Sequence, residues 1–261
     1  MAQVIESNED LKPAAGGMLS EGRLPVMEIF GPTMQGEGWM AGKQSYFVRF
    51  GGCSFRCNWC DSMHAVDPQS VRDNARWMRK YDIVIELETL GGALACEWVT
   101  LSGGDPAIWD QSGMINALHA YGYKVAMETQ GYVHRTWMAK LNLLTVSPKG
   151  PSSGMLLRYE PGVLYQVLTT LAERVVMKIV IADQHDLEWA ADMARNYPQL
   201  QLYLSAMTPP PFPGEDINDT RKRVSQSYTH LVKKALNVAA LKNAILLPQL
   251  HVLVWGHQKG V

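Results

Sequence analysis

Three closely spaced cysteines are the part of this sequence best suited to chemistry. Cys53, Cys57 and Cys60 follow the spacing C-x3-C-x2-C directly after an alternating apolar segment at 46–50. Thiolates are soft ligands that favour iron–sulfur clusters or zinc over hard cations. Three thiolates on a 4Fe-4S cluster leave one iron without a protein ligand, and an open iron can bind and activate a small molecule. The spacing therefore predicts a cluster-binding loop at the end of a strand.

Two other uses of these thiols remain open at this point. A structural zinc site could take His64 as its fourth ligand, although zinc sites usually draw their ligands in pairs from two separated segments. A disulfide would leave one of the three clustered thiols unpaired. The remaining cysteine, Cys96, is distant in the sequence.

Length and composition bound the class of protein. The chain has 261 residues, of which 47% are hydrophobic, enough for one large α/β domain with a full core. Lys and Arg number 24 against 25 Asp and Glu, so no basic excess indicates a nucleic-acid groove. We see no secretory signal and no apolar stretch long enough for a membrane span. These features predict a cytoplasmic protein, where thiols stay reduced.

The elements that must position the cysteines form an alternating series. Residues 1–23 are polar and predict a flexible leader, with a single domain over 24–261 that ends in a helix and a strand (216–261). Strands followed by helices form right-handed βαβ units and a parallel sheet. We expect strands at 26–30, 44–50, 82–87, 98–101, 124–129, 143–147, 175–181, 201–205 and 248–255, and helices at 68–81, 111–121, 134–141, 161–174, 186–197 and 219–241.

Polar and glycine-rich residues gather where these strands end. They lie in the cysteine loop, Ser102–Asp105, Glu128–Gln130 and Ser147–Lys149. Ligands of parallel α/β folds bind at the carboxyl ends of the strands, so these segments predict a site on one rim of the sheet. The periodicity does not decide between a partial barrel and an open sheet.

With these segments in view, the cysteine motif resembles that of the radical S-adenosylmethionine superfamily. Trp59 occupies the aromatic position before the third cysteine, and the run from Ser102 to Pro106 resembles the GGEP motif that binds the amino group of S-adenosylmethionine. Asp105 stands where that motif has Glu, which keeps the charge on a shorter side chain. The resemblance implies a 4Fe-4S cluster whose open iron is chelated by S-adenosylmethionine.

Several ordered segments narrow the resemblance to the 7-carboxy-7-deazaguanine synthases. They are Phe30–Gly38, Cys60–Ser62, Glu128–Gly131, Ser147–Lys149 and Pro248–His251, within a match that runs from about residue 28 to the C-terminus. The resemblance implies a homodimeric modified (β/α)6 partial barrel of the radical S-adenosylmethionine type. It also implies a radical-mediated ring contraction of 6-carboxy-5,6,7,8-tetrahydropterin to 7-carboxy-7-deazaguanine with loss of ammonia. A flavodoxin-like or other protein would donate the electron, and the product would enter 7-deazapurine (queuosine-type) biosynthesis.

The resemblance assigns roles by position. Cys53, Cys57 and Cys60 would hold the cluster, and Ser62, which replaces the family's Thr, would bind Mg2+. Arg49 would pair with the substrate carboxylate, and Glu128 would accept hydrogen bonds from the pterin and act as a polar helper in catalysis. The other implied substrate contacts are Met34, Gln35, Gly36, Glu37, Ser102, Gln249 and His251. The implied cofactor contacts are Trp59, Cys60, Asp61, Gly103, Gly104, Asp105, Gln130, Ser147, Pro148, Lys149, Ser205, Ala206, Met207 and Thr208, although the family usually has a Gln-Pro-containing sequence at 205–208.

Two other functions compete with this one. The first is another small radical S-adenosylmethionine enzyme, such as an activase that makes a glycyl radical. That enzyme would consume S-adenosylmethionine without consuming the carboxypterin. The second is a non-catalytic zinc or cluster module that binds a partner. A zinc module would be colourless, and a non-catalytic cluster module would not bind S-adenosylmethionine.

Overall fold

One curved sheet organises the molecule. The computed structural model describes residues 22–158, 160–208, 210–258 and 260–261. Nine strands are ordered β3-β1-β2-β4-β5-β6-β7-β8-β9. The pairs β1–β2 and β1–β3 are antiparallel, and every pair from β2–β4 to β8–β9 is parallel. The strands are Arg23–Met34 (β1), Gln44–Phe50 (β2), Arg76–Arg79 (β3), Trp98–Gly103 (β4), Lys124–Thr129 (β5), Leu143–Val146 (β6), Val175–Ile181 (β7), Gln201–Ala206 (β8) and Ile245–Leu247 (β9).

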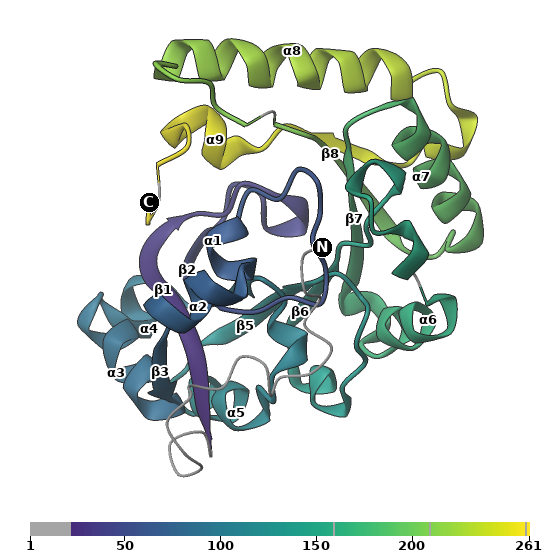
Figure 1. The fold of residues 1–261 in the computed structure, drawn as a ribbon. Coiled ribbons are helices and arrows are strands. Elements are labelled where there is room, and N and C mark those ends of the chain that lie inside the picture. Colours follow the sequence, from purple (N-terminus) through teal and green to yellow (C-terminus); the bar gives the residue numbers. More distant parts are fainter. Residues whose placement is uncertain (1–21, 159, 209, 259) are drawn as a thin grey trace.

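The larger helices cover the outside of this sheet. Figure 1 shows the sheet curling into an open barrel with α3, α5, α6, α7 and α8 around it, and this arrangement confirms the predicted α/β partial barrel. The helices are Met63–Val66 (α1), Pro68–Asn74 (α2), Lys80–Thr89 (α3), Gly92–Ala95 (α4), Ser112–Ala120 (α5), Pro161–Thr169 (α6), Gln184–Asn196 (α7), Ile217–Ala235 (α8) and Leu250–Trp255 (α9). Short 3-10 helices include Gly38–Met40 (η2) and Thr136–Lys140 (η4).

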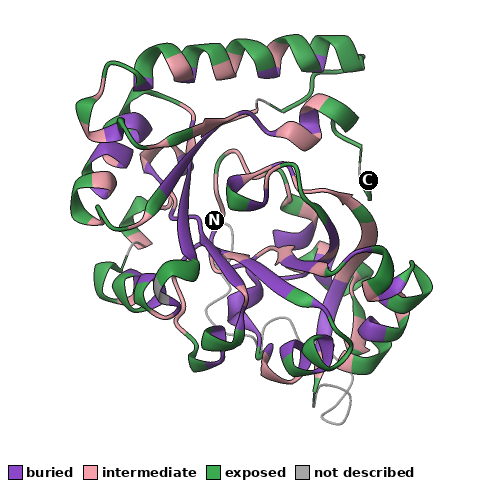
Figure 2. Cartoon of the chain, turned by 180° about the vertical axis from the view of Figure 1, so that it is seen from behind, coloured by how far each residue is buried: buried purple, intermediate pink, exposed green. Residues whose placement is uncertain are grey.

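The core lies between the strands and these outer helices. Figure 2 shows the strands largely buried and the outward faces of the helices exposed. In α5, Met114, Ile115 and Leu118 are buried at helical spacing, which is how an amphipathic helix covers a sheet. None of the helices in the described ranges is both long and apolar enough to cross a membrane.

The strand predicted at 82–87 is wrong, because these residues lie in α3. Ile83, Val84 and Leu87 are buried there, and their spacing suits one face of a helix as well as a short strand. The Asp82 carboxylate accepts a hydrogen bond of 3.0 Å from the backbone N–H of Arg79 and caps the helix start. The helix predicted at 68–81 consequently ends at Asn74, and β3 follows it at the sheet edge.

The strand predicted at 248–255 is also wrong. The last strand is β9, and the apolar run after it forms the short helix α9. A run of apolar residues this short does not separate a strand from a helix by its pattern. At the other end of the chain, 1–21 of the predicted leader lie outside the described residues, and Arg23 already belongs to β1.

Candidate active site

The loop after β2 brings the three thiols of the cysteine motif into one apolar cluster. Cys53 is 6% exposed and packs with Phe55, while Cys57 and Cys60 are partly buried against the same cluster. Burial raises the pKa of Cys53 to about 12 and that of Cys60 to about 11. Bare thiolates are therefore disfavoured here, and the positive iron ions of a cluster would supply the charge that stabilises them. The donor set fits a 4Fe-4S cluster.

The zinc and disulfide alternatives are not supported by the geometry. His64 Nε2 lies 3.6 Å from Glu28 Oε2, so the imidazole faces a carboxylate. Across the described ranges, no three His, Cys, Asp or Glu side chains converge on a point that would hold one metal ion. All four cysteines are free. A cluster is larger than an ion, so its thiolates need not converge in this way.

The turn after β4 packs tightly against the end of β2. The backbone N–H of Gly104 donates to Phe50 O at 3.0 Å, and that of Asp105 donates to Gly52 O at 2.8 Å. A Cβ at Gly103 or Gly104 would overlap the backbone of the β2 end. These glycines are thus required by the protein's own packing, in addition to any ligand that approaches them.

Asp105 carries an unmatched charge beside this turn. Its Oδ1 accepts hydrogen bonds from Thr129 Oγ1 at 2.8 Å and from the backbone N–H of Ala107 at 3.1 Å. Its Oδ2 is buried and has no hydrogen-bond partner among the described residues. Burial raises the pKa of this carboxyl to about 6. A buried oxygen of this kind suits a cationic ligand group, such as the amino group of S-adenosylmethionine.

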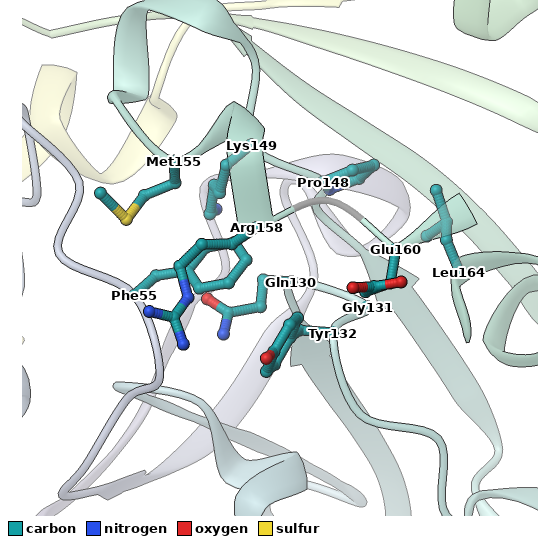
Figure 3. Close-up of a pocket in the computed structure, with 10 residues that line it drawn as sticks. All are labelled: Phe55, Gln130, Gly131, Tyr132, Pro148, Lys149, Met155, Arg158, Glu160 and Leu164. Carbon is teal, nitrogen blue, oxygen red and sulfur yellow. The ribbon is translucent and has the colours of Figure 1, made fainter. Parts of the chain in front are cut away.

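A small pocket is lined by further predicted cofactor residues, among them Gln130 (Figure 3). The Cys53 thiol donates to Gln130 Oε1 at 3.4 Å, while Gln130 Nε2 is buried without a partner in the described part of the chain. The pocket is also lined by Pro148 and Lys149. The amide hydrogens on Gln130 Nε2 can therefore be donated to a bound cofactor.

Trp59 and Ser147 both lie close to the Lys149 side chain. Lys149 Nζ donates to Ser147 Oγ at 3.0 Å and lies 6.0 Å from the centre of the Trp59 ring. The cysteine loop and the segment after β6 therefore place an aromatic ring, a hydroxyl and a cation together. At the end of β8, Ser205 Oγ and Thr208 Oγ1 are buried without partners among the described residues. These donor groups fit the predicted cofactor.

A buried cation of the sheet pairs with two carboxylates. Lys178, on β7, is 3% exposed, and its Nζ lies 2.6 Å from Glu37 Oε2 and 2.5 Å from Glu128 Oε1. Burial opposes the charge of Lys178, but the two glutamates outweigh it and raise its pKa. Burial likewise opposes ionisation of Glu37, but the Lys178 and His251 charges outweigh it and hold the Glu37 pKa at about 2. Lys178 and Glu37 are therefore both ionised at neutral pH.

The C-terminal segment closes over the loop that carries Glu37. Gln249 Nε2 donates to Glu37 Oε1 at 2.8 Å, and the backbone N–H of Leu250 donates to Gly36 O at 3.1 Å. A side chain at Gly36 would overlap His251, so only glycine permits this approach. The structure thus brings together Gly36, Glu37, Gln249 and His251, which are four of the predicted substrate contacts.

The first residues of the predicted substrate loop make other contacts. Met34 ends β1, opposite Gln44 of β2. Gln35 Oε1 accepts hydrogen bonds from its neighbours' backbone N–H groups, at 2.7 Å from Gly36 and 3.2 Å from Glu37. The Gln35 side chain therefore stabilises the loop that presents Glu37.

Arg49 is held by side chains on both sides. Its Nε lies 2.6 Å from Glu28 Oε2, and an Nη donates to Ser62 Oγ at 3.0 Å. Ser102 lies opposite Arg49 in the β2–β4 register, and its Oγ is buried without a partner among the described residues. The nearby His64 imidazole and Arg49 guanidinium hold the Glu28 pKa at about 2.

Ser62 does not form a magnesium site in this arrangement. Its hydroxyl donates to Asp61 Oδ1 at 3.0 Å and accepts from Arg49. A guanidinium bonded to the same oxygen repels a divalent cation, so these residues do not fit Mg2+ as they stand.

Sequence reasoning missed two charged residues of the site. Lys178 interrupts the apolar run of β7, whose other residues are almost all buried. A charge in a strand covered on both faces needs a partner, and that signal was available. Glu28 lies opposite Arg49 in the β1–β2 register, a pairing that only the register reveals.

The fold is shared with a solved enzyme. The crystal structure of QueE from Escherichia coli aligns with a TM-score of 0.60, covering 87% of this chain and 94% of that one at 23% identity. These features define the fold class as a partial barrel of the radical S-adenosylmethionine type.

Sequence comparison narrows this class to one family. The 7-carboxy-7-deazaguanine synthase of Bacillus subtilis (strain 168) is 38% identical over 249 residues, covering 91% of this chain and 98% of that protein. The Bacillus cereus protein of the same name is 37% identical over 247 residues, covering 92% and 99%. The chain belongs to the 7-carboxy-7-deazaguanine synthase family. No family model matches it.

Proposed function

We propose that this chain converts 6-carboxy-5,6,7,8-tetrahydropterin to 7-carboxy-7-deazaguanine with release of ammonia, as a carbon–nitrogen lyase of 7-deazapurine (queuosine-type) biosynthesis. The observation that carries the proposal is a continuous set of groups at one end of the sheet. The Cys53 thiol is hydrogen-bonded to Gln130, Asp105 is hydrogen-bonded to Thr129, and the residue before that, Glu128, is paired with Lys178. The cluster, S-adenosylmethionine and the pterin ring would therefore bind next to one another.

The chain's own residues would bind and orient the reactants. Cys53, Cys57 and Cys60 would hold the cluster, and Asp105 with Lys149 would hold the amino and carboxylate groups of S-adenosylmethionine. When bound, the cluster and S-adenosylmethionine supply a carbon radical that removes a hydrogen atom from the substrate, as is usual for cofactor-borne radical chemistry.

The substrate would be recognised by opposite charges at its two ends. Glu128 would accept hydrogen bonds from the amino group and ring N–H of the pterin, which only an acceptor such as a carboxylate can do in pairs. Arg49 would pair with the substrate carboxylate, a task suited to its planar guanidinium. The cover formed by Gln249 and His251 would exclude water from the ring.

The proposal includes a homodimer in the cytoplasm, reduced by a flavodoxin-like or other electron donor. These features follow from the family and from the need of the thiols for a reducing compartment. Mg2+ is left out of the proposal, because the Ser62 hydroxyl already lies between Arg49 and Asp61.

An anaerobic assay tests the proposal. Reconstituted protein is incubated with dithionite, S-adenosylmethionine and 6-carboxytetrahydropterin, and the products are identified by mass spectrometry. We expect 7-carboxy-7-deazaguanine. If 5'-deoxyadenosine formed and the pterin remained, another radical S-adenosylmethionine enzyme, such as an activase, would be favoured. If a brown protein formed neither product, the binding-module alternative would return.

A further inference from the structure

Lys178 joins two glutamates that differ in how many of their oxygens are already bonded. Both oxygens of Glu37 have partners within the protein: Oε2 faces Lys178 Nζ at 2.6 Å, and Oε1 accepts from Gln249 at 2.8 Å. Glu128 faces Lys178 through Oε1 alone, at 2.5 Å, and its side chain is 27% exposed. Lys178 itself is 3% exposed. The carboxylate that remains available to a ligand therefore belongs to Glu128.

The bond from Lys178 restricts Glu128 in two ways. It occupies one carboxylate oxygen with a buried cation, so it fixes the direction in which the other oxygen points. It also comes from the middle of a buried strand, so the cation itself is anchored on a rigid element. A carboxylate fixed in this way is ready to accept hydrogen bonds from a planar ring without first losing side-chain freedom.

We propose that Lys178 is a positioning residue for substrate recognition, which orients Glu128 toward the ring N–H groups of the pterin while Glu37 anchors Lys178 from the other side. This inference rests on the proposed function. It gives Glu37 the role of a structural partner, held by Lys178 and Gln249, and leaves Glu128 as the carboxylate that contacts substrate.

A purely structural role for Lys178 makes a different prediction. A double variant that keeps the net charge of the group separates the two roles. The group has one positive and two negative charges, so its net charge is one negative. Replacing Lys178 by Met and Glu37 by Gln together leaves only the Glu128 charge, and the net charge stays the same. Gln at position 37 can still accept from Gln249. The double variant therefore removes the buried pair while Glu128 loses its anchor.

The experiment compares wild type, Lys178→Met, Glu37→Gln, the double variant Lys178→Met/Glu37→Gln, and Lys178→Arg. For each, the melting temperature, the KM and kcat for 6-carboxytetrahydropterin, and the KM for S-adenosylmethionine are measured. Calorimetry of 7-carboxy-7-deazaguanine binding to the cluster-free protein gives a second readout that does not depend on turnover. Lys178→Met alone should lower the melting temperature, because it leaves the two carboxylates without their buried cation.

The double variant decides the question. We expect a melting temperature close to wild type, a pterin KM raised about tenfold or more, a matching loss of product affinity, and an unchanged KM for S-adenosylmethionine. Glu37→Gln alone should change the pterin KM by less than about threefold, and Lys178→Arg should lose less pterin affinity than the double variant because it keeps a cation that can pair with Glu128. A folded double variant with the wild-type pterin KM and product affinity would overturn the inference, as would a folded Lys178→Arg as weak as the double variant. A wild-type protein that does not convert the pterin would overturn the proposed function instead.

Discussion

Gln249 donates a hydrogen bond of 2.8 Å to Glu37, across 212 positions of sequence. A second hydrogen bond, from the backbone N–H of Leu250 to Gly36 O at 3.1 Å, joins the neighbouring residues of the same two segments. Together they attach the start of α9 to the loop after β1. The C-terminal segment is therefore part of the site wall, so its loss affects the substrate pocket directly.

Replacing Gln249 by Leu should loosen this wall. The change leaves one oxygen of the partly buried Glu37 carboxylate without its donor, which costs about 1–3 kcal/mol. We expect a lower free energy of unfolding, faster amide hydrogen exchange at 36–38, and a raised pterin KM. Gln258→Leu, an exposed change near the same end of the chain, is the control. Unchanged exchange at 36–38 in Gln249→Leu would show that the bond does not hold the loop.

Arg49→Ala should weaken substrate binding. Loss of a charge-assisted pair with the substrate carboxylate corresponds to about 1.5–3 kcal/mol, or about a tenfold to hundredfold rise in KM. Steady-state kinetics at saturating S-adenosylmethionine measure it, with Arg72→Ala on the exposed side of α2 as control. An unchanged KM would place Arg49 outside the pocket.

The ion pair of Glu28 predicts a pH-dependent stability. The Glu28 pKa lies at about 2 in the folded protein against a model-compound value of 4.5. A carboxyl whose folded pKa is depressed adds stability above its unfolded pKa, and loses it as pH falls toward its folded pKa. The stability difference between wild type and Glu28→Gln should thus be constant from about pH 5.5 to 4.5 and shrink below that. Urea unfolding at each pH measures it, and a difference that stays constant down to about pH 3 would contradict the assignment.

Cys57→Ala should abolish the brown colour of anaerobically reconstituted protein. Removal of one thiolate leaves two protein ligands for the cluster, and its charge-transfer absorption should be lost. Cys96→Ser is the matched control, because Cys96 is buried in the main hydrophobic core and apart from the thiol cluster. Iron and sulfide analysis with a visible spectrum checks both variants. A colourless Cys96→Ser, or a brown Cys57→Ala, would mean that the ligands are assigned wrongly.

The central strands could be predicted from the sequence to the residue. Gln44–Phe50, Lys124–Thr129 and Val175–Ile181 are strands with the predicted bounds. Each is a short run rich in apolar residues between turn formers, a pattern typical of strands buried in a sheet. The cysteine motif and the polar strand ends could be placed on one rim for the same reason.

Other features depend on contacts that no local pattern contains. The spacing of Ile83, Val84 and Leu87 suits a strand or a helix, and only packing against the sheet decides for α3. The pairing of Lys178 with Glu37 spans 141 positions. That Lys178 has a partner could be inferred from its position inside a buried strand, but which residue is the partner could not.

The most direct test follows one hydrogen atom. 6-Carboxytetrahydropterin carrying deuterium at C6 is incubated anaerobically with the reconstituted enzyme, dithionite and S-adenosylmethionine, and both products are analysed by mass spectrometry. We predict deuterium in 5'-deoxyadenosine together with 7-carboxy-7-deazaguanine, and no pterin consumption by the Cys57→Ala protein. Unlabelled 5'-deoxyadenosine with intact pterin would contradict the account, because the radical would then act on a different substrate.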